Sequence, residues 1–461
     1  MTPCPSLSRR MVLRGSFATA GALALASQPG LLTPARARQS DSATEVTFWH
    51  GFTGARGETL QALVDRYNAL GTGVTVNALP FGSYEEVAEN LVRALQDGSA
   101  PDLVAMSEAL WFRFYLAGAI QPLDDLISQT GFDLDDLIPA FRVEGQRAGS
   151  TWWLPFSRST PLVYYNQNML ADAGLDVFPG SWAEFAEIAP SLNDEDQQIV
   201  ALAQSTIANL VAWAFQGVCW SFGGAYSDAQ LNILIDEPGA IAAGNFYRRS
   251  IDEGWGYASP QGNQDLGNGF AAATIASTGV LNDTATLAKA TGFTLGTAPL
   301  PAAEPGGPVA CPTGGSGLFV VAGRPAEQQA AAFDFLAWCL EPDNTAAWAQ
   351  DTGYMPVRTS AIEGEAMQAF FAENPNFRTV VDQLPVARPS DTARTWVPGG
   401  DAMIADAITR IIIESTDSES AFTTVAAELL EASQPVREQI IALEGDLGTP
   451  AATPVVGRVT R

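Results

Sequence analysis

Histidine is nearly absent from this sequence, and its absence limits the chemistry that the chain can perform. The only histidine among the 461 residues is His50, so a metal site built from several histidines is excluded. A nucleophile activated by histidine has this one residue as its candidate. Because His50 follows Phe48 and Trp49 at the expected end of a strand, we interpret it as a packed or pocket-edge residue and not as a base.

Cysteine is also scarce. The chain contains four cysteines, no two of them in a C-x-x-C motif, and Cys4 lies in a segment that we expect to be removed. The other three, Cys219, Cys311 and Cys339, permit one disulfide in an oxidising compartment, with the pairing undetermined, or three buried thiols. The sequence leaves both alternatives open.

Positive charge is low in proportion to negative charge. Lysine and arginine total 24 against 51 aspartates and glutamates, which gives a formal charge of −27 at pH 7. A chain with this charge repels phosphate backbones and anionic lipid head groups, so we expect no nucleic-acid partner. After its N-terminal segment the sequence also lacks an uncharged apolar run of the about 20 residues that a membrane-spanning helix needs.

Residues 1–38 have the order of a twin-arginine signal peptide. This segment contains five arginines and no acidic residue, and the pattern SRRMVLR occupies 8–14. A weakly apolar run at 18–26 and a small-x-small cleavage site at 35–37 follow. No cysteine follows the apolar run, so nothing supports a lipid anchor there. The prediction is export by the twin-arginine route to the periplasm or the outer face of the cell membrane.

The remaining sequence is long and apolar enough for two α/β cores. A chain of 461 residues exceeds what one core accommodates, and 47% of its residues are hydrophobic. Strand and helix patterns alternate in the order 45–49 (strand), 57–70 (helix), 74–79 (strand), 83–95 (helix) and 101–106 (strand). The second helix begins with a capping box of Ser83 and Glu86. This run predicts half of a doubly wound sheet, whose strands end at a ligand-binding crevice.

The segment 152–165 breaks the alternation with two prolines and an aromatic run, and we interpret it as the first crossover to a second lobe. Several crossings between lobes are what a hinge requires. Further strands are expected at 270–278, 293–300 and 317–322, and helices at 326–340, 344–350, 370–383, 400–414 and 420–432. The predicted ranges are 45–155 with 279–340 for one lobe, 156–278 with 341–440 for the other, and 441–461 for a flexible tail.

Seven segments carry a resemblance to a known family, and their order and spacing make it specific. They are TFWHGF (47–52), FGSYEEVAENL (81–91), APDLVAMSE (100–108), LPFSRSTPLVYYN (154–166), TIASTG (274–279), GGSGLFVV (314–321) and WAQDTGYMPV (348–357). On these residues the chain resembles the extracellular solute-binding proteins of carbohydrate-type ABC importers from about residue 45 to 432. Within that family it is most similar to the members that bind glycerol 3-phosphate.

The resemblance implies a two-lobed α/β periplasmic-binding fold of type II, with the ligand held between lobes that each contain a sheet flanked by helices. It implies a binding protein and not an enzyme, without catalytic residues, metal or cofactor. The implied partners are a small polyol-phosphate or sugar ligand and the transmembrane permease subunits of an ABC importer. We expect the protein to act as a monomer.

Mapping the family's binding motif onto this sequence gives six ligand-binding positions: Tyr84, Glu108, Ser159, Ser277, Gly315 and Tyr354. These residue types suit a polyol, because a carboxylate accepts strong hydrogen bonds from hydroxyls and a tyrosine offers a flat face with a polar tip. The glycines at 314–317 let the backbone approach a ligand closely. They do not form a nucleotide P-loop.

Two departures from the family pattern bear on the cargo. The family's phosphate-binding arginine aligns with Asp401, Ala402 or Ile404, so we expect Arg394 to replace it, with Trp396 beside it. The family's Gly-Trp pair falls near 203–206, which contains no tryptophan, so that side should be roomier. The sequence therefore predicts glycerol 3-phosphate or a glycerophosphodiester such as glycerophosphocholine. A neutral mono- or oligosaccharide is the alternative, followed by an extracellular glycoside hydrolase, for which no carboxylate pair is identifiable.

Overall fold

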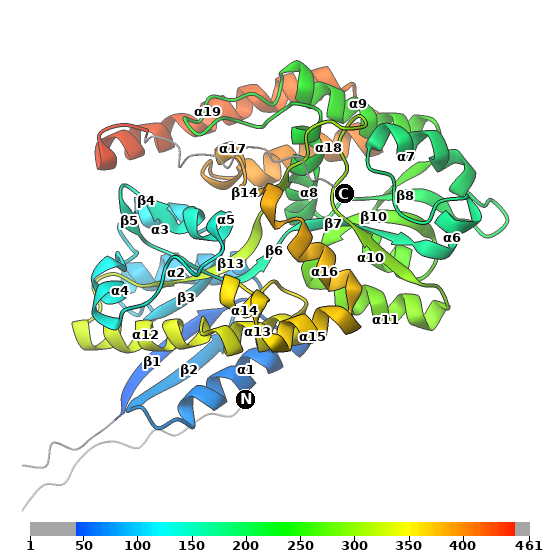
Figure 1. Ribbon diagram of the computed structural model, residues 1–461. Helices are drawn as coiled ribbons and strands as arrows, with labels where there is room; N and C mark the ends of the chain where they lie inside the picture. Colours follow the sequence, from blue (N-terminus) through cyan, green and yellow to red (C-terminus); the bar gives the residue numbers. More distant parts are fainter. Residues whose placement is uncertain (1–42, 448–461) are drawn as a thin grey trace, which may run out of the picture. The chain divides into compact units, whose positions relative to one another are not determined.

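The computed structural model describes residues 43–447, in which two five-stranded sheets organise the chain (Figure 1). The first sheet has the strand order β2 (Val74–Pro80), β1 (Thr44–His50), β3 (Leu103–Ser107), β13 (Gly314–Val320) and β6 (Leu154–Ser159). β1 is parallel to β2 and β3, whereas β13 is antiparallel to β3 and β6. The predicted βαβαβ unit is present, and two strands from later in the chain extend its sheet.

The second sheet is also mixed. Its order is β11 (Leu295–Ala298), β7 (Pro161–Asn166), β10 (Ala271–Ser277), β8 (Val200–Ser205) and β9 (Gly256–Ser259). β10 is parallel to β8 and antiparallel to β7. There are also two small sheets: β12 (Cys311–Pro312) pairs with β14 (Ala387–Arg388), and β4 (Gln146–Arg147) pairs with β5 (Ser150–Thr151).

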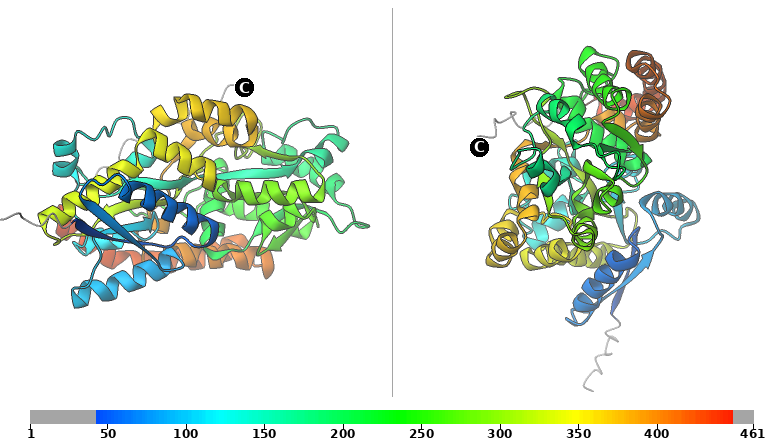
Figure 2. Two further views of the ribbon diagram at one scale, coloured as in Figure 1. Left: turned by 90° about the horizontal axis from the view of Figure 1, so that it is seen from below. Right: turned by 90° about the vertical axis from the view of Figure 1, so that its right-hand side faces the viewer.

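Helices cover both sheets, and each sheet with its helices forms one lobe. Those of the first lobe are α1 (Gly54–Asn68), α2 (Tyr84–Asp97), α3 (Phe112–Leu116), α4 (Asp124–Thr130), α5 (Pro139–Arg142), α12 (Ala326–Cys339), α13 (Pro342–Thr352), α14 (Thr359–Glu363) and α15 (Glu365–Glu373). Those of the second lobe are α6 (Gln167–Asp172), α7 (Trp182–Ile188), α8 (Ala208–Ser221), α9 (Pro238–Asp252), α10 (Gly262–Gly267), α11 (Leu281–Thr291), α16 (Pro375–Asp382), α17 (Thr392–Thr395), α18 (Gly400–Ile413) and α19 (Ser418–Glu444). In Figure 2 the yellow helices α12–α15 lie on the opposite side from α19.

Local sequence signals explain where helix α2 begins and ends. Ser83 caps α2 because its side chain accepts a hydrogen bond from the backbone N–H of Glu86, as the capping box predicts. Gly98 ends the helix in the left-handed conformation, with φ of 77°, which glycine adopts without steric cost. α2 therefore begins at Tyr84, directly at the end of the first sheet.

The chain passes directly from the first sheet to the second. β6 ends at Ser159 and β7 begins at Pro161, inside the segment 152–165 that was expected to be the first crossover. Two stretches lie in the other lobe than the one predicted. The helices α13–α15 fall within 341–440, which the sequence assigned to the second lobe, but they cover the first sheet, and α11 with β11 shows the reverse. β11 falls within 279–340, which the sequence assigned to the first lobe, but it pairs antiparallel with β7 in the second sheet. It does so because α11 returns the chain along the edge of that sheet.

The last helix corrects the sequence reading. A helix was expected over 420–432 and a flexible tail from 441, but α19 runs from Ser418 to Glu444. Pro435 lies inside the helix, where proline normally interrupts hydrogen bonding. Burial of Val436 and Ile440 beyond it holds the following turns in place. Residues 448–461 lie outside the described part of the chain.

Residues 43–447 settle the state of the cysteines and show two further features. Cys219, Cys311 and Cys339 are free and buried, so the alternative of three buried thiols is the one observed, and burial raises the pKa of each thiol. Across the same range no helix combines the length and apolarity required to cross a bilayer. No group of histidine, cysteine or carboxylate side chains in this range is arranged to hold a metal ion.

Candidate functional site

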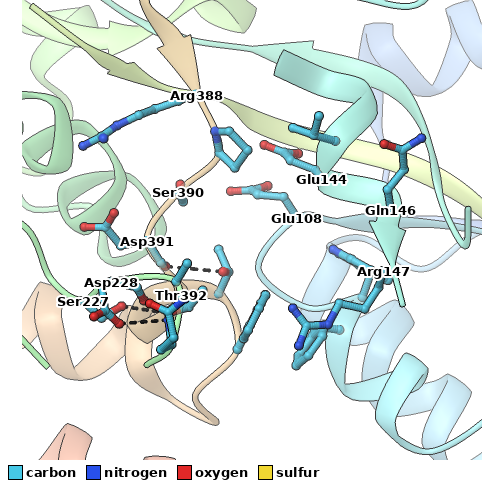
Figure 3. Close-up of a pocket in the computed structure, with 18 of the residues that line it drawn as sticks. Glu108, Glu144, Gln146, Arg147, Ser227, Asp228, Arg388, Ser390, Asp391 and Thr392 are labelled. Atoms are coloured by element: carbon cyan, nitrogen blue, oxygen red, sulfur yellow. Dashed lines mark hydrogen bonds between the residues drawn. The ribbon is translucent and has the colours of Figure 1, made fainter. Parts of the chain in front are cut away.

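A cavity of about 840 Å³ lies between the two lobes. The first lobe contributes Glu108, which follows β3, and the segment 143–149 around the β4–β5 hairpin. The second lobe contributes the loop 225–230 and the segment 388–396, which includes α17. Figure 3 shows Glu108 in the middle of the cavity, with Arg147 on one side and Asp228 and Asp391 on the other.

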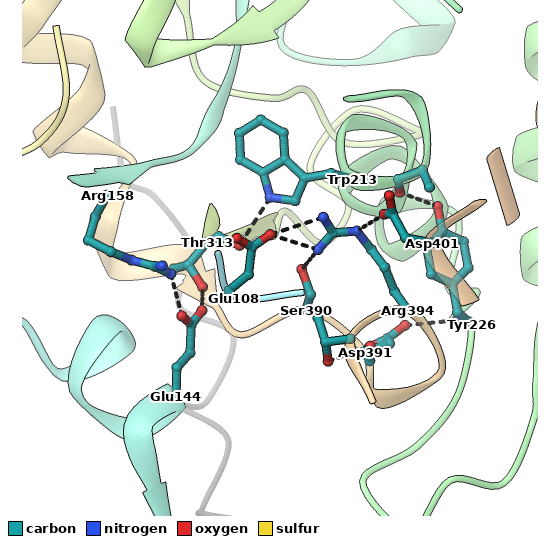
Figure 4. Close-up of polar contacts among 12 residues, drawn as sticks. Glu108, Glu144, Arg158, Trp213, Tyr226, Thr313, Ser390, Asp391, Arg394 and Asp401 are labelled. Carbon is teal, nitrogen blue, oxygen red and sulfur yellow. Dashed lines mark hydrogen bonds and ion pairs between the residues drawn. The ribbon is translucent and has the colours of Figure 1, made fainter. Parts of the chain in front are cut away.

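An ion pair at the centre of the site joins the lobes. The side chain of Arg394, which is 3% exposed, donates from both terminal nitrogens to Oε1 of Glu108 at 3.0 Å. Arg394 also donates to Ser390 at 2.9 Å, and its Nε lies 2.6 Å from Oδ1 of Asp401 (Figure 4). Burial raises the pKa of Asp401, and the charge of Arg394 opposes this shift. The guanidinium of Arg394 therefore forms ion pairs with two carboxylates, one from each lobe.

A second buried pair lies next to the first. Glu144, in the short 3-10 helix Val143–Gly145, contacts the guanidinium of Arg158 and the hydroxyl of Thr313. Burial raises the pKa of Glu144 to about 7, against the opposing charge of Arg158. Sequence reasoning missed Glu144, because its segment carries no motif and its partner Arg158 reaches it only through the folded sheet.

Tyr84 and Tyr354, two of the predicted binding residues, lie near Glu108. Burial raises the pKa of Tyr84, and the charges of Tyr354 and Glu108 add to the shift. The Tyr84 hydroxyl is buried and makes no hydrogen bond of good geometry within residues 43–447. Tyr354 stacks parallel on Trp348 with ring centroids 6.4 Å apart, and the guanidinium of Arg56 lies 5.5 Å from its ring centroid.

The predicted serines and glycine lie where the sheets meet. Ser159 ends β6 and pairs with Gly314, whereas Ser277 ends β10 and accepts a hydrogen bond from the N–H of Gly279 at 3.2 Å. Gly315 has φ of 95°, and its carbonyl accepts the backbone N–H of Glu108 at 3.0 Å. Of the eight predicted binding residues, two line the 840 Å³ cavity, namely Glu108 and Trp396.

Arg147 and Trp396 connect the lobes at the edge of the cavity. The indole of Trp396, from the second lobe, stacks on Phe112 of the first lobe with centroids 4.4 Å apart and an interplanar angle of 15°. The guanidinium of Arg147 lies 4.5 Å from the Trp396 ring centroid. Arg147 also donates to Glu444 at 2.8 Å and to the carbonyl of Leu447 at 2.9 Å. The sequence indicated Trp396 as a binding residue beside Arg394 but not its contacts with Phe112 and Arg147. It gave no sign of Arg147 or Glu444.

His50 lies outside the cavity and is packed, as its sequence position indicated. It is buried, and its Nδ1 accepts the N–H of Phe52 at 3.2 Å. Its ring lies 5.5 Å from that of Phe48 and 5.9 Å from that of Phe52. His50 is therefore a packed residue of the first lobe.

The titration of His50 gives the first testable prediction. Burial lowers the pKa of His50 to about 4. Between pH 6.5 and 4 the unfolded chain therefore binds a proton that the folded chain does not, and the free energy of unfolding falls as the pH is lowered, by at most about 1.4 kcal/mol per pH unit. NMR should show one imidazole that titrates near pH 4. In His50→Asn, which keeps an acceptor for the N–H of Phe52, this contribution should be absent; equal pH dependence in both proteins would contradict it.

Comparison with known proteins places this geometry in a family. The family model described as "Bacterial extracellular solute-binding protein" matches residues 62–379. The chain belongs to the bacterial extracellular solute-binding proteins. It is therefore a binding protein and not an enzyme: it binds a small ligand outside the cytoplasm and delivers it to the permease of an ABC importer.

Two similar relatives are both described as sn-glycerol-3-phosphate-binding proteins. The sn-glycerol-3-phosphate-binding periplasmic protein UgpB of Pectobacterium atrosepticum is 26% identical over 358 residues, which cover 75% of this chain and 80% of the relative. UgpB of Escherichia coli K12 is 27% identical over 379 residues, covering 79% and 84%.

Solved structures show the same two-lobed fold. UgpB from Mycobacterium tuberculosis in complex with glycerophosphocholine is 35% identical, with a TM-score of 0.78 and coverage of 85% of this chain and 98% of that one. The sugar-binding protein MalE from Xanthomonas citri is 18% identical, with a TM-score of 0.74 and coverage of 87% and 100%. The second likeness concerns the fold alone. The predicted type II binding fold is thereby confirmed.

Proposed function

We propose that this solute-binding protein captures a glycerophosphodiester, such as glycerophosphocholine, between its lobes. The observation that carries the proposal is a buried arginine, Arg394, which is held on Glu108 beside an 840 Å³ cavity. A guanidinium fork matches phosphate oxygens, and a carboxylate accepts hydrogen bonds from the hydroxyls of glycerol. A phosphate with a glycerol on one side and a head group on the other suits both groups and the remaining volume.

The size of the cavity favours a diester over glycerol 3-phosphate itself. Cavities of about 300–1,000 Å³ enclose drug-sized ligands, and glycerol 3-phosphate is smaller than these. The relatives support both parts of the proposal, since the curated ones are described as binding sn-glycerol 3-phosphate and the solved one contains glycerophosphocholine. We propose that the ligand is contacted by Tyr84, Glu108, Ser159, Ser277, Gly315, Tyr354, Arg394 and Trp396.

Thermal unfolding with a panel of ligands tests the proposal. A ligand that binds only the folded protein stabilises it by about 2.7 kcal/mol at one hundred times its Kd. Glycerophosphocholine is therefore expected to raise the Tm by several degrees, and glycerol 3-phosphate by less at equal concentration. Phosphocholine, which lacks the glycerol, is the matched control and should give a smaller shift than glycerophosphocholine. A shift with maltose and none with glycerophosphocholine would refute the proposal.

A neutral saccharide is the second candidate, and one observation favours it. Arg394 is already shared by Glu108 and Asp401, so its charge is offset before any ligand arrives. A site of this kind could bind hydroxyls alone. Salt distinguishes the two candidates, because binding of a charged phosphate weakens as ionic strength rises and binding of a neutral sugar does not.

We also propose that residues 1–38 direct export by the twin-arginine route and that the protein acts as a monomer. The arginine pair and the small-x-small motif within 1–38 support the first part; this segment lies outside the described residues. The predicted lobe ranges, 45–155 with 279–340 and 156–278 with 341–440, are retained as a proposal apart from α11, β11 and the helices α13–α15.

A further inference from the structure

The charges around the cavity are not balanced. The carboxylates that line it include three in ion pairs with arginines. The pairs are Glu108 with Arg394, Glu144 with Arg158, and Glu444 with Arg147. Arg394 is shared with a second acid. Glu108, Glu144 and Glu444 are therefore each opposed by an arginine, whereas within residues 43–447 the second-lobe carboxylates Asp228 and Asp391 are in no such pair.

Asp228 is a second-lobe carboxylate that receives only neutral donors. Its Oδ1 accepts the backbone N–H groups of Gln230 and Asn232, each at 2.9 Å. Its Oδ2 accepts the side-chain amide of Asn232 at 2.7 Å. Within residues 43–447 Asp228 forms no ion pair. These bonds fix the carboxylate in its loop, but they leave its full negative charge at the cavity wall.

Asp391 lies on the same wall and is also held by neutral donors. It accepts the indole N–H of Trp220 at 3.1 Å and the backbone N–H of Tyr226 at 2.8 Å. Burial raises its pKa, and the charge of Arg388, whose guanidinium stacks on Trp220, acts in the opposite direction. Asp391 is thus partly compensated by Arg388, and Asp228 is not compensated.

Hydrogen bonds join these two acids into one surface, which we call the acidic wall (Asp228 and Asp391). The hydroxyl of Thr392, next to Asp391, donates to the carbonyl of Asp228 at 2.7 Å. The hydroxyl of Ser227 accepts the backbone N–H of Ala393 at 2.8 Å. Figure 3 shows the wall facing the cavity from the side opposite Gln146 and Arg147. Its position is therefore fixed relative to Arg394, because Asp391 directly precedes α17, the short helix that contains Arg394.

We infer that the acidic wall receives a positively charged group of the ligand, so that this protein selects phosphodiesters with a cationic head group over those with a neutral or anionic one. The inference rests on the proposed function, in which Arg394 and Glu108 hold the glycerol phosphate. With that end fixed at the centre of the cavity, the head group extends into the remaining volume beside Asp228. An opposite charge at this wall gains Coulomb energy in a partly desolvated space, whereas an anionic head group is repelled.

Two ligands that differ only in head group test the inference. Glycerophosphocholine and glycerophosphoglycerol share the glycerol and the phosphate, and only the first carries a cation. Calorimetric titration of the purified protein should give a Kd at least about tenfold lower for glycerophosphocholine, and this preference should shrink with added salt. Equal Kd values for the two ligands would overturn the inference.

Asp228→Asn removes the charge and keeps an acceptor oxygen for the loop. It is expected to reduce the preference to about twofold or less, with the Kd for glycerophosphoglycerol unchanged within about twofold. Asp125→Asn, at an exposed acid in the first turn of α4, is the matched control and should keep the full preference. If Asp228→Asn weakens both ligands equally, or neither, the acidic wall does not select the head group. If neither diester binds at millimolar concentration, the proposed function fails together with the inference.

Discussion

Replacing Arg394 with alanine is expected to lower the free energy of unfolding by about 3–5 kcal/mol. The substitution leaves Glu108 and Asp401 without the guanidinium that bridges them. Removing one partner of a buried ion pair costs this much because the remaining charge stays in a medium of low polarity. Here two carboxylates are left, one from each lobe, and they repel each other. Urea denaturation with an unchanged m-value would measure the loss.

A matched control separates this effect from the loss of any arginine. Arg378 forms an exposed pair with Asp382 at 2.8 Å, and exposed pairs contribute about 0–1 kcal/mol. Arg378→Ala should therefore change stability little. Arg394→Lys keeps the charge but loses the fork that reaches both acids, and it should recover part of the stability. An Arg394→Ala protein as stable as Arg378→Ala would show that Glu108 and Asp401 are accommodated without the guanidinium.

The same variant bears on the ligand. If Arg394 binds the phosphate, any Arg394→Ala protein that folds should bind glycerophosphocholine at least about a hundredfold more weakly, since charge-assisted and bidentate bonds are lost. Unchanged affinity that is insensitive to salt would favour the neutral saccharide. The stability and the binding measurement are independent, so each part of the interpretation can fail separately.

Much of the fold follows from local sequence signals. The strand at 45–49 and the helix at 83–95 are observed as Thr44–His50 and Tyr84–Asp97, because alternation, the Ser83 cap and Gly98 act over a few residues. The position of Glu108 at the end of β3 follows equally, since strands of a doubly wound sheet end at the crevice. The features predicted correctly are those that depend on residues close together in the sequence.

The charge arrangement of the site could not be predicted in the same way. Arg394 reaches Glu108 across 286 positions of sequence, and Arg158 reaches Glu144 only because β6 and the short helix Val143–Gly145 pack together. Asp228 lies in a loop that shows no binding motif. Such pairs depend on how whole lobes pack, and a single sequence does not specify that packing locally. The resemblance supplied Arg394 and Glu108 as candidates but not their contact.

Gly315→Ala is expected to lower the free energy of unfolding by about 3 kcal/mol or more. Gly315 has φ of 95°, and a Cβ there would lie 2.0 Å from the carbonyl oxygen of Ser157. The methyl group is opposed both by backbone strain and by a backbone atom of β6 that cannot move alone. Because the carbonyl of Gly315 accepts the N–H of Glu108, a shift of β13 would also displace the carboxylate that holds Arg394.

Gly292 provides the control that separates clash from strain. Its φ is 94°, almost that of Gly315, but a Cβ there meets nothing within 4 Å. Gly292→Ala should therefore cost only the left-handed conformation, about 1–2 kcal/mol, and leave ligand affinity unchanged. Gly315→Ala should exceed it in lost stability and also weaken binding, as measured by urea denaturation and calorimetry. Equal losses of stability in the two variants would mean that β13 and β6 move apart without cost to admit the methyl group. The close packing of Gly315 on Ser157 would then not position Glu108.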